Sequence, residues 1–428
     1  MKQLIALQRN KSTISPAGDE LVPTVETSSN LRFHDFASLF DKAPQSDDAL
    51  LWRLLVALFD DIPLRLPEGL DPLARYKALA ISRRQTLSDW LETAVASSVA
   101  VEARDGSVPK RIFSLLSGNQ IERAVELAGK EQYLHLATLI AEHGSDPAVA
   151  EDLHEQLSLW HEQRVSAQID PALLRVYALL SGELDTIAAV RAQDPLESIP
   201  AIYVTGALDW KRAFGLRLWF GEGAAEHDAS LALKEYEEFF GTTKKAPPVR
   251  NGERDATFEL IRAALRPEIP LDNVLEPKTF AGSAFDFRMT WHIYVMLARV
   301  LKQRDFVDRE TVDMTDDDFE VVGHSPTADL VTNGYAAQLE AAGLYSEAVF
   351  VLLHLEAPEG YVVCNYCLNQ LLTKRRRVRA IKDLLSHNFT RLDDDDFNQF
   401  DQYEIPGTWI EEARVSALLE LQGLLLTL

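Results

Sequence analysis

Apolar residues recur every three or four positions along most of the chain from Leu31 onward, the spacing that lines one face of an α-helix. The first strong example is the segment 47–61, in which Leu51, Leu55 and Leu58 share a face before Pro63 ends the pattern. Further helices are predicted by the same criterion at 72–82, 86–103, 119–130, 132–142, 147–165, 171–181, 183–193, 209–220, 229–240, 254–265, 284–301, 327–342 and 344–355.

Alternating strand patterns are almost absent, and the two short candidates are Phe319–Val322 and Tyr361–Val363. Consecutive helical pairs of unequal length, with no fixed repeat period, are typical of an irregular helical stack. The 428 residues also exceed the about 250–300 that one compact core usually holds. We therefore predict an all-α fold, an irregular α-solenoid. Residues 1–30 lack periodicity and are rich in Ser, Thr and Pro, so we expect a flexible linker there.

Composition narrows the possible partners. The formal net charge of −23 disfavours binding to nucleic acid, because an acidic surface repels phosphate backbones. The chain has only two cysteines, which indicates a reducing compartment rather than a disulfide framework. No run of about 18 apolar residues is present, so no segment is expected to insert into a membrane.

Several residue groups resemble sites but lack the required partners. Cys364 and Cys367 form a CxxC pair with no second pair of zinc ligands at a typical spacing. His154 and His161 are seven residues apart, whereas a zinc-binding HExxH helix needs four. The acidic runs 316–318 and 393–396 lack the mid-loop glycine of a calcium loop, so solvated loops or helix N-caps are expected.

Other motifs favour packing over chemistry. The basic cluster Lys374–Arg379 is a weak sign of nuclear import or nucleic-acid binding on an acidic chain. The seven tryptophans are expected mainly in the core. No phosphate-binding or nucleophile-elbow motif is present, so we nominate no catalytic, cofactor-binding or metal-binding residue and no cofactor. We expect a protein without enzymatic activity.

Three segments together resemble one family: Gly118–Gly144, Leu208–Trp219 and Asn333–Leu355. The second segment contains the letters LDWKR, and the third contains YAAQLE followed by GL and AVFVLLHL. In this order they resemble the helical coat nucleoporin at the hub of the Y-shaped nuclear pore complex, here of fungal type. That family is the C-terminal product of a self-cleaving large precursor and belongs to the ancestral coatomer elements.

The resemblance implies a helical block that folds back on itself. We expect an ascending trunk at 31–105, a crown at 106–275 and a returning trunk at 276–357, followed by the start of an incomplete tail module at 380–428. The implied role is a structural scaffold of the pore coat in the nuclear envelope, supporting transport of protein and mRNA. The alternative is a vesicle-coat scaffold or assembly protein of the same architecture, and an all-α enzyme with an unrecognised site is a third possibility.

The resemblance also implies partners. The crown would bind the neighbouring stalk nucleoporin, and the tail would bind the arm nucleoporins. A strand segment before the trunk would complete a β-propeller protein shared with the vesicle coat, and we expect that segment to be missing because residues 1–30 show no strand pattern.

The segment 358–379 interrupts the family pattern and is predicted to be an irregular insert. Gly360-Tyr361-Val362 can be encoded by a fungal-type splice donor, and Leu372-Thr373 by a branch sequence. Deleting the intervening residues restores continuity with the family. We hypothesise that this segment is translated intron sequence, which sequencing of the transcript would test.

Overall fold

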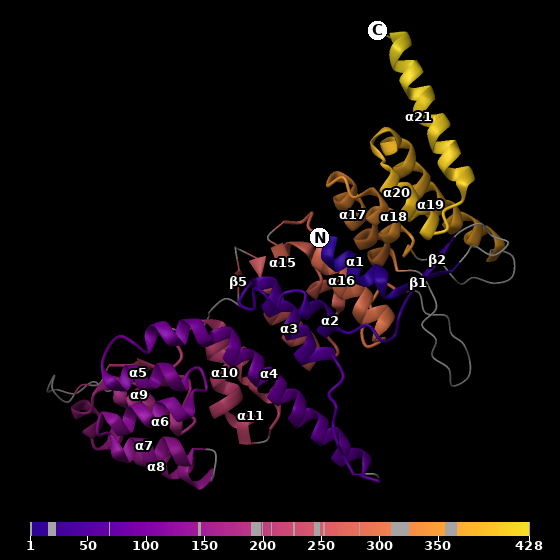
Figure 1. The fold of residues 1–428 in the computed structure, drawn as a ribbon. Helices are drawn as coiled ribbons and strands as arrows, with labels where there is room; N and C mark the ends of the chain where they lie inside the picture. Colours follow the sequence, from indigo (N-terminus) through magenta and orange to yellow (C-terminus); the bar gives the residue numbers. More distant parts are fainter. Residues whose placement is uncertain are drawn as a thin grey trace. The chain divides into compact units, whose positions relative to one another are not determined.

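The computed structural model describes residues 2–15, 23–67, 69–143, 147–189, 198, 200–206, 208–225, 227–243, 249–250, 253–281, 283–309, 325–355 and 366–427 (Figure 1). Helices dominate these ranges, and the strands within them form three two-stranded antiparallel sheets. The predicted all-α class and irregular helical stack are confirmed. The chain divides into two compact units, which are described separately below.

Unit 1 combines residues 1–42 and 249–263 with 267–428, so that the two ends of the chain share one unit. Its strands are β1 (Ser12–Ser15), β2 (Thr24–Thr27), β5 (Val249–Arg250) and β6 (Glu253–Arg254). Its helices are α1 (Lys2–Asn10), α2 (Phe33–Ser38), most of α13 (Ala256–Leu265), α14 (Leu271–Val274), α15 (Pro277–Ala281), α16 (Arg288–Tyr294) with a π-helical extension (Val295–Val300), α17 (Pro326–Ala341), α18 (Tyr345–Leu352), α19 (Tyr366–Asn388) with a 3₁₀ turn (Phe389–Arg391), α20 (Asp394–Gln402) and α21 (Gly407–Thr427).

Unit 2 comprises residues 43–248 and 264–266. Its strands are β3 (Thr186–Ile187) and β4 (Ile202–Tyr203). Its helices are α3 (Asp47–Phe59), α4 (Pro72–Glu102), α5 (Val108–Leu116), α6 (Ile121–Lys130), α7 (Leu134–Glu142), α8 (Pro147–Glu162), a 3₁₀ turn (Val165–Gln168), α9 (Pro171–Leu180), α10 (Trp210–Phe220), α11 (Glu222–Ala225) and α12 (Ala229–Thr243).

Most predicted helices are present with their expected ends. Helix α3 begins after Ser46, whose hydroxyl accepts the Ala49 amide, and the predicted apolar face of this helix is buried. Helices α6 and α7 form the predicted pair, and they meet at Gln132, whose φ of 63° is left-handed. Helices α17 and α18 form the second predicted pair, and the second of them is buried all round, as the sequence predicts.

The prediction of two helices at 72–82 and 86–103 is wrong, because α4 is continuous from Pro72 to Glu102. Residues 83–85 are Arg, Arg and Gln, which favour helix, and no glycine or proline interrupts them. The Arg83 side chain donates to the Ala57 carbonyl, and the Thr86 hydroxyl donates to the same oxygen. The charged connection is therefore the contact surface between α4 and α3.

The predicted helix at 183–193 is wrong for its described part. Thr186 and Ile187 form β3, which pairs with β4 at Ile202 and Tyr203. Thr and Ile are β-branched and favour strands, and the Thr205 hydroxyl donates to the Leu184 carbonyl next to the sheet. The predicted helix 284–301 is shorter, since it begins at Arg288 and turns into a π-helix at Val295.

The linker predicted at 1–30 is wrong for the described residues. Helix α1 buries Leu4, Ile5 and Gln8 on one face, and β1 pairs with β2. Helix α1 is only nine residues long, and β1 and β2 are four residues each. Segments this short and this polar are too brief for a helical or an alternating pattern to be recognised in the sequence. The expectation of a missing strand segment therefore loses its basis.

The described part of the predicted insert is not irregular, because residues 366–379 belong to helix α19. The two strand candidates Phe319–Val322 and Tyr361–Val363 lie outside the described residues. The intron hypothesis and the trunk, crown and tail boundaries stay predictions.

Candidate protein-interaction site

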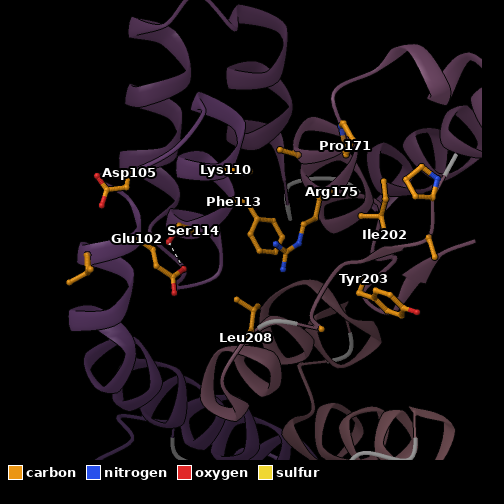
Figure 2. A pocket seen from close by; sticks show the side chains of 15 residues that line it. Glu102, Asp105, Lys110, Phe113, Ser114, Pro171, Arg175, Ile202, Tyr203 and Leu208 are labelled. Carbon is orange, nitrogen blue, oxygen red and sulfur yellow. Dashed lines mark hydrogen bonds between the residues drawn. The ribbon is translucent and has the colours of Figure 1, made fainter. Parts of the chain in front are cut away.

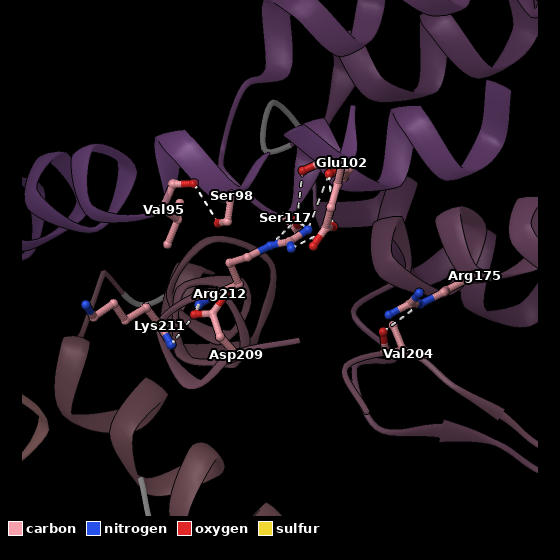
Figure 3. Close-up of polar contacts among 10 residues, drawn as sticks. Val95, Ser98, Glu102, Ser117, Arg175, Val204, Asp209, Lys211 and Arg212 are labelled. Carbon is pink, nitrogen blue, oxygen red and sulfur yellow. Dashed lines mark hydrogen bonds and ion pairs between the residues drawn. The ribbon is translucent and has the colours of Figure 1, made fainter. Parts of the chain in front are cut away.

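Helix α10 carries the segment Leu208–Trp219, and nearly all of its side chains are buried, including two arginines. The helix begins where the Asp209 carboxylate accepts the amides of Lys211 and Arg212, at 3.0 and 3.2 Å (Figure 3). This cap satisfies amides that have no partner within the helix. Asp209, the aspartate of the LDWKR segment, therefore fixes where α10 starts.

Arg212 links α10 to two other helices (Figure 3). Its Nε donates to the Ser117 hydroxyl after α5 at 2.9 Å, and its Nη1 lies 2.7 Å from the Glu102 carboxylate at the end of α4. The Arg212 side chain is 2% exposed, whereas Glu102 is 54% exposed. Because one partner is solvated, the hydroxyl contacts and the burial of the guanidinium contribute more than the ion pair itself.

Arg217 makes a second anchor, an ion pair with Asp185, and its guanidinium lies 4.7 Å from the centre of the Phe239 ring. Burial lowers the pKa of Arg217, and the nearby Asp185 carboxylate opposes that shift. Gly215 leaves room for the Trp219 ring, since a Cβ at position 215 would lie 2.7 Å from it. The Trp219 indole in turn donates to the Ser88 hydroxyl of α4 at 2.8 Å.

The second signature segment forms α17 and α18. A Cβ on Gly334 would lie 2.6 Å from the Phe287 ring, so only glycine allows this close approach. The Gln338 side chain accepts the Phe287 amide and donates to Asp286, each at 3.0 Å. The residues YAAQLE thus hold the start of α16 against α17.

Two buried histidines lie in the same core. His292 Nδ1 is 2.6 Å from the Gln8 side-chain oxygen, and its Nε2 is 3.3 Å from the Tyr335 hydroxyl. Because the Gln8 oxygen can only accept, Nδ1 carries the proton and Nε2 accepts from Tyr335. Burial lowers the pKa of His292 well below its usual value, and burial lowers that of His354 to about 3. Both rings are neutral packing elements with no access to solvent.

A groove of about 1040 Å³ lies on the surface of unit 2 (Figure 2). Residues of α4, α5, α9 and β4 line this groove. Arg175 projects into it, stacked 3.8 Å from the centre of the Phe113 ring, and its Nε donates to the Val204 carbonyl at 2.7 Å. Burial lowers the pKa of Arg175 to about 10, with Arg212 adding to this shift and Glu102 opposing it. An apolar groove with a few fixed charges is suited to binding a protein segment.

The sequence missed Phe113 because helix α5 was not predicted, and Arg175 lies on the predicted helix 171–181 but was not identified as a site residue. The sequence does contain a start signal for helix α5, namely Ser107 followed by Pro109, which places a proline in the first turn. A single sequence offers no means of predicting that Arg175 packs on Phe113, because the two lie on different helices.

The sequence groups weighed as sites have structural explanations where they are described. Asp393 caps α20, and Asp396 returns the hydrogen bond to the Asp393 amide, as a capping box does. His154 is exposed on α8. Five of the seven tryptophans are buried, as predicted for the core, namely Trp52, Trp90, Trp219, Trp291 and Trp409. Residues 316–318 and Cys364 lie outside the described residues, and the side chain of Cys367 is not described.

The basic cluster Lys374–Arg379 lies in α19, where the Arg377 side chain donates to the Leu355 carbonyl and Arg379 pairs with Asp383 at 3.6 Å. Within the described ranges, histidine, cysteine and carboxylate side chains do not gather into a group that could hold a metal ion. No helix there combines the length and apolar character needed to cross a bilayer.

A family model for nuclear protein 96 (Nup96) matches residues 110–417, which is more than half of the chain. The chain belongs to the Nup96 family. The matched range includes all three segments on which the resemblance rests, 118–144, 208–219 and 333–355.

Named relatives extend over most of the chain. The sequence is 28% identical to nucleoporin nup189 of Schizosaccharomyces pombe over 318 residues, which cover 73% of this chain and 17% of that protein. It is 24% identical to nuclear pore complex protein Nup98-Nup96 of Drosophila melanogaster over 85% of this chain and 17% of that protein. It is 26% identical to nucleoporin NUP145 of Saccharomyces cerevisiae over 80% of this chain and 23% of that protein. The chain thus spans less than a quarter of the length of these three relatives.

Proposed function

We propose that this chain is a structural scaffold subunit of the nuclear pore complex coat in the nuclear envelope. The observation that carries the proposal is the Nup96 match over 110–417, together with relatives whose names state that they are nucleoporins or nuclear pore complex proteins. An all-α stack with extended helical surfaces suits assembly with several neighbours, because such surfaces recognise partners by shape.

A role without catalysis is part of this proposal. Its support is that the polar signature residues already serve the fold: Asp209 caps a helix, Arg212 binds two hydroxyls and Gln338 binds a backbone amide. His292, the one histidine with contacts to both ring nitrogens in that core, is fully buried. A catalytic group must instead reach a substrate.

We propose further that the stalk-neighbour nucleoporin binds through residues 106–275. The support is the groove beside Arg175, most of whose lining residues fall in that range. Gel filtration of the full chain with that nucleoporin, mixed at micromolar concentrations, is expected to give a stable one-to-one complex. Separate elution of the two proteins would contradict this assignment.

Two more contacts complete the proposal. The β1–β2 sheet provides strand structure before the trunk, so a β-propeller partner becomes a candidate again. Helices in 380–428 would contact the arm nucleoporins. Deleting residues 12–27, which removes β1 and β2 and keeps helix α1, should abolish co-purification of the propeller protein while the arm proteins are retained. Truncation after residue 379 should abolish co-purification of the arm proteins while the propeller protein is retained.

The vesicle-coat alternative has no observation in its favour, since the relatives compared above are nucleoporins. Affinity purification of the tagged chain from its own cells separates the two possibilities. Recovery of nucleoporins at amounts equal to the bait supports the proposal, and recovery of vesicle-coat subunits in their place would overturn it.

A further inference from the structure

The first three turns of α4 expose a cluster of large apolar side chains. Leu73, Tyr76 and Ile81 are 61%, 70% and 47% exposed, and Leu70 and Leu79 lie close by and are also exposed. Single exposed apolar residues are ordinary on a protein surface, but Leu73, Tyr76 and Ile81 lie within one broad face of the helix, and a group of this kind marks an interaction site. Figure 1 shows this end of α4 extending beyond the other elements of unit 2.

This patch continues a stripe that the chain itself covers farther along the helix. Leu73, Ala80 and Leu87 follow each other at intervals of two turns, and they therefore lie on one side of α4. Leu87 and Leu91, at the covered end, are 1% and 0% exposed. The same helix thus presents one apolar face that is buried in its second half and open in its first.

Helix α10 covers the buried half. The Arg84 side chain donates to the Leu218 carbonyl, and the Ser88 hydroxyl accepts from the Trp219 indole. Helix α10 ends at Phe220, so its contact with α4 stops at about Arg84. A second helix lying along Leu73–Ile81 would extend the packing that α10 begins.

The other side of this end of α4 is already occupied. Residues 61–67 run alongside it, with Ile62, Leu64 and Leu66 half-buried, and together with Arg75 and Leu79 they line a cavity of about 390 Å³. The open side is therefore the one that carries Leu73, Tyr76 and Ala80. We call these three residues, together with Lys77 and Ile81, the open α4 face.

The charge around this face differs from that of the chain as a whole. Arg65, Arg75 and Lys77 are exposed, and in the part of the chain that the structure describes their side chains form no hydrogen bond or ion pair. The full chain carries −23. Cations beside an apolar stripe favour a partner that carries carboxylates next to its own apolar stripe.

We propose that the open α4 face binds an amphipathic helix of a partner protein, with acidic residues flanking its apolar stripe. The partner helix would bury Leu73, Tyr76 and Ala80 as α10 buries Leu87 and Leu91, and its carboxylates would pair with Lys77. A second copy of this chain would bring like cations together, and an anionic membrane surface is recognised by clusters of about 4–8 basic residues, more than this face carries. The proposal goes beyond the pore-scaffold role and does not depend on it.

Site-specific photo-crosslinking tests the proposal in the cells of origin. A benzoylphenylalanine replaces Tyr76 in the full-length chain, and a second version carries it at Leu134, an exposed position on α7. Mass spectrometry of the crosslinked peptides at position 76 is expected to give one protein segment with apolar residues at helical spacing and flanking Asp or Glu. Position 134 should not yield that segment.

Charge reversal then tests the recognition chemistry. Lys77→Glu is expected to lower the crosslink yield, and the affinity of a synthetic peptide of the mapped segment measured by fluorescence anisotropy, by about tenfold or more. Lys130→Glu, an exposed position with the same charge change, should leave both unchanged. Crosslinks only to lipid, only to another copy of the chain or to a segment without acidic residues would overturn the proposal, and so would equal binding by Lys77→Glu.

Discussion

In unit 2 the signature helix α10 is anchored by buried arginines, whereas in unit 1 the signature pair α17–α18 surrounds neutral aromatic and histidine rings. Arg212 and Arg217 each reach a carboxylate that is about half exposed, so part of that stability involves groups in contact with solvent. Trp291, His292 and Tyr335 are completely buried: His292 makes polar contacts to Tyr335 and Gln8, and the Trp291 ring packs against His292 and Tyr335. The chain therefore uses buried arginines in unit 2 and close packing of neutral rings in unit 1, and the two units should respond differently to mutation and to pH.

The largest expected effect is the loss of the ring at the centre of the unit 1 core. Trp291→Ala removes a fully buried indole that contacts His292, Tyr335 and His354, and should lower the free energy of unfolding by about 3–5 kcal/mol. Hydrogen exchange with mass spectrometry should show faster exchange in α16–α18, with α10 unchanged. Phe285→Ala, at a side chain that is 81% exposed, is the control and should change little.

Arg212→Ala should have the next largest effect and should act on unit 2. The substitution leaves the Ser114 and Ser117 hydroxyls without their buried donor and removes the packing of the side chain, at a cost of about 2–3 kcal/mol. Exchange in α10 and α5 should speed up. Lys234→Ala breaks an exposed pair with Glu238 and should change stability by less than about 0.5 kcal/mol. Equal effects of the two variants would show that Arg212 is not an anchor.

Acid should destabilise the unit 1 core through its histidines. The folded-state pKa of His292 and of His354 is depressed, so the unfolded chain binds more protons below its own pKa of about 6.5. Their contribution is therefore complete above that value and is lost as the pH falls below it, down to about 3 for His354. Between pH 7.5 and 5.5 the loss should be about 2–3 kcal/mol for the pair, measured by urea unfolding.

Substitution of one histidine checks the origin of that pH dependence. His354→Gln should remove roughly half of it, because each of the two neutral rings takes up a proton when the chain unfolds below about pH 6.5. His154→Gln changes an exposed ring and should leave the pH dependence as it is. An unaltered profile for His354→Gln would assign the acid response to other groups.

The last expected effect comes from a pair of glycines with opposite outcomes. Gly334→Ala should cost about 1–3 kcal/mol, because its Cβ would meet the Phe287 ring. Gly129→Ala lies inside α6 with nothing within 4 Å and should stabilise by up to about 1 kcal/mol through its helix propensity. Thermal unfolding of the two variants side by side tests whether the family glycine is a packing requirement.

The sequence predicts the helical class and most long helices, because periodic burial and end signals such as Asp209 and Ser46 are local. It does not predict that 72–102 is a single helix, since only the contact of Arg83 with α3 explains its charged middle. The sequence also fails to predict α1. At least one of its three buried residues contacts a segment nearly 300 residues away in the sequence, as the Gln8–His292 bond shows. The groove could not be predicted for the same reason, because Phe113 and Arg175 are far apart in the sequence and meet only in the folded unit.

The central claim, that this Nup96-family chain is a scaffold of the nuclear pore coat, is tested most directly by its position and exchange in living cells. A fluorescent fusion at the chromosomal locus should outline the nuclear rim in discrete spots that coincide with other nucleoporins. Fluorescence at the rim should recover slowly after bleaching, since a subunit held by several large interfaces dissociates slowly. Puncta that coincide with vesicle coats away from the nucleus, or diffuse fluorescence with recovery in seconds, would contradict the claim.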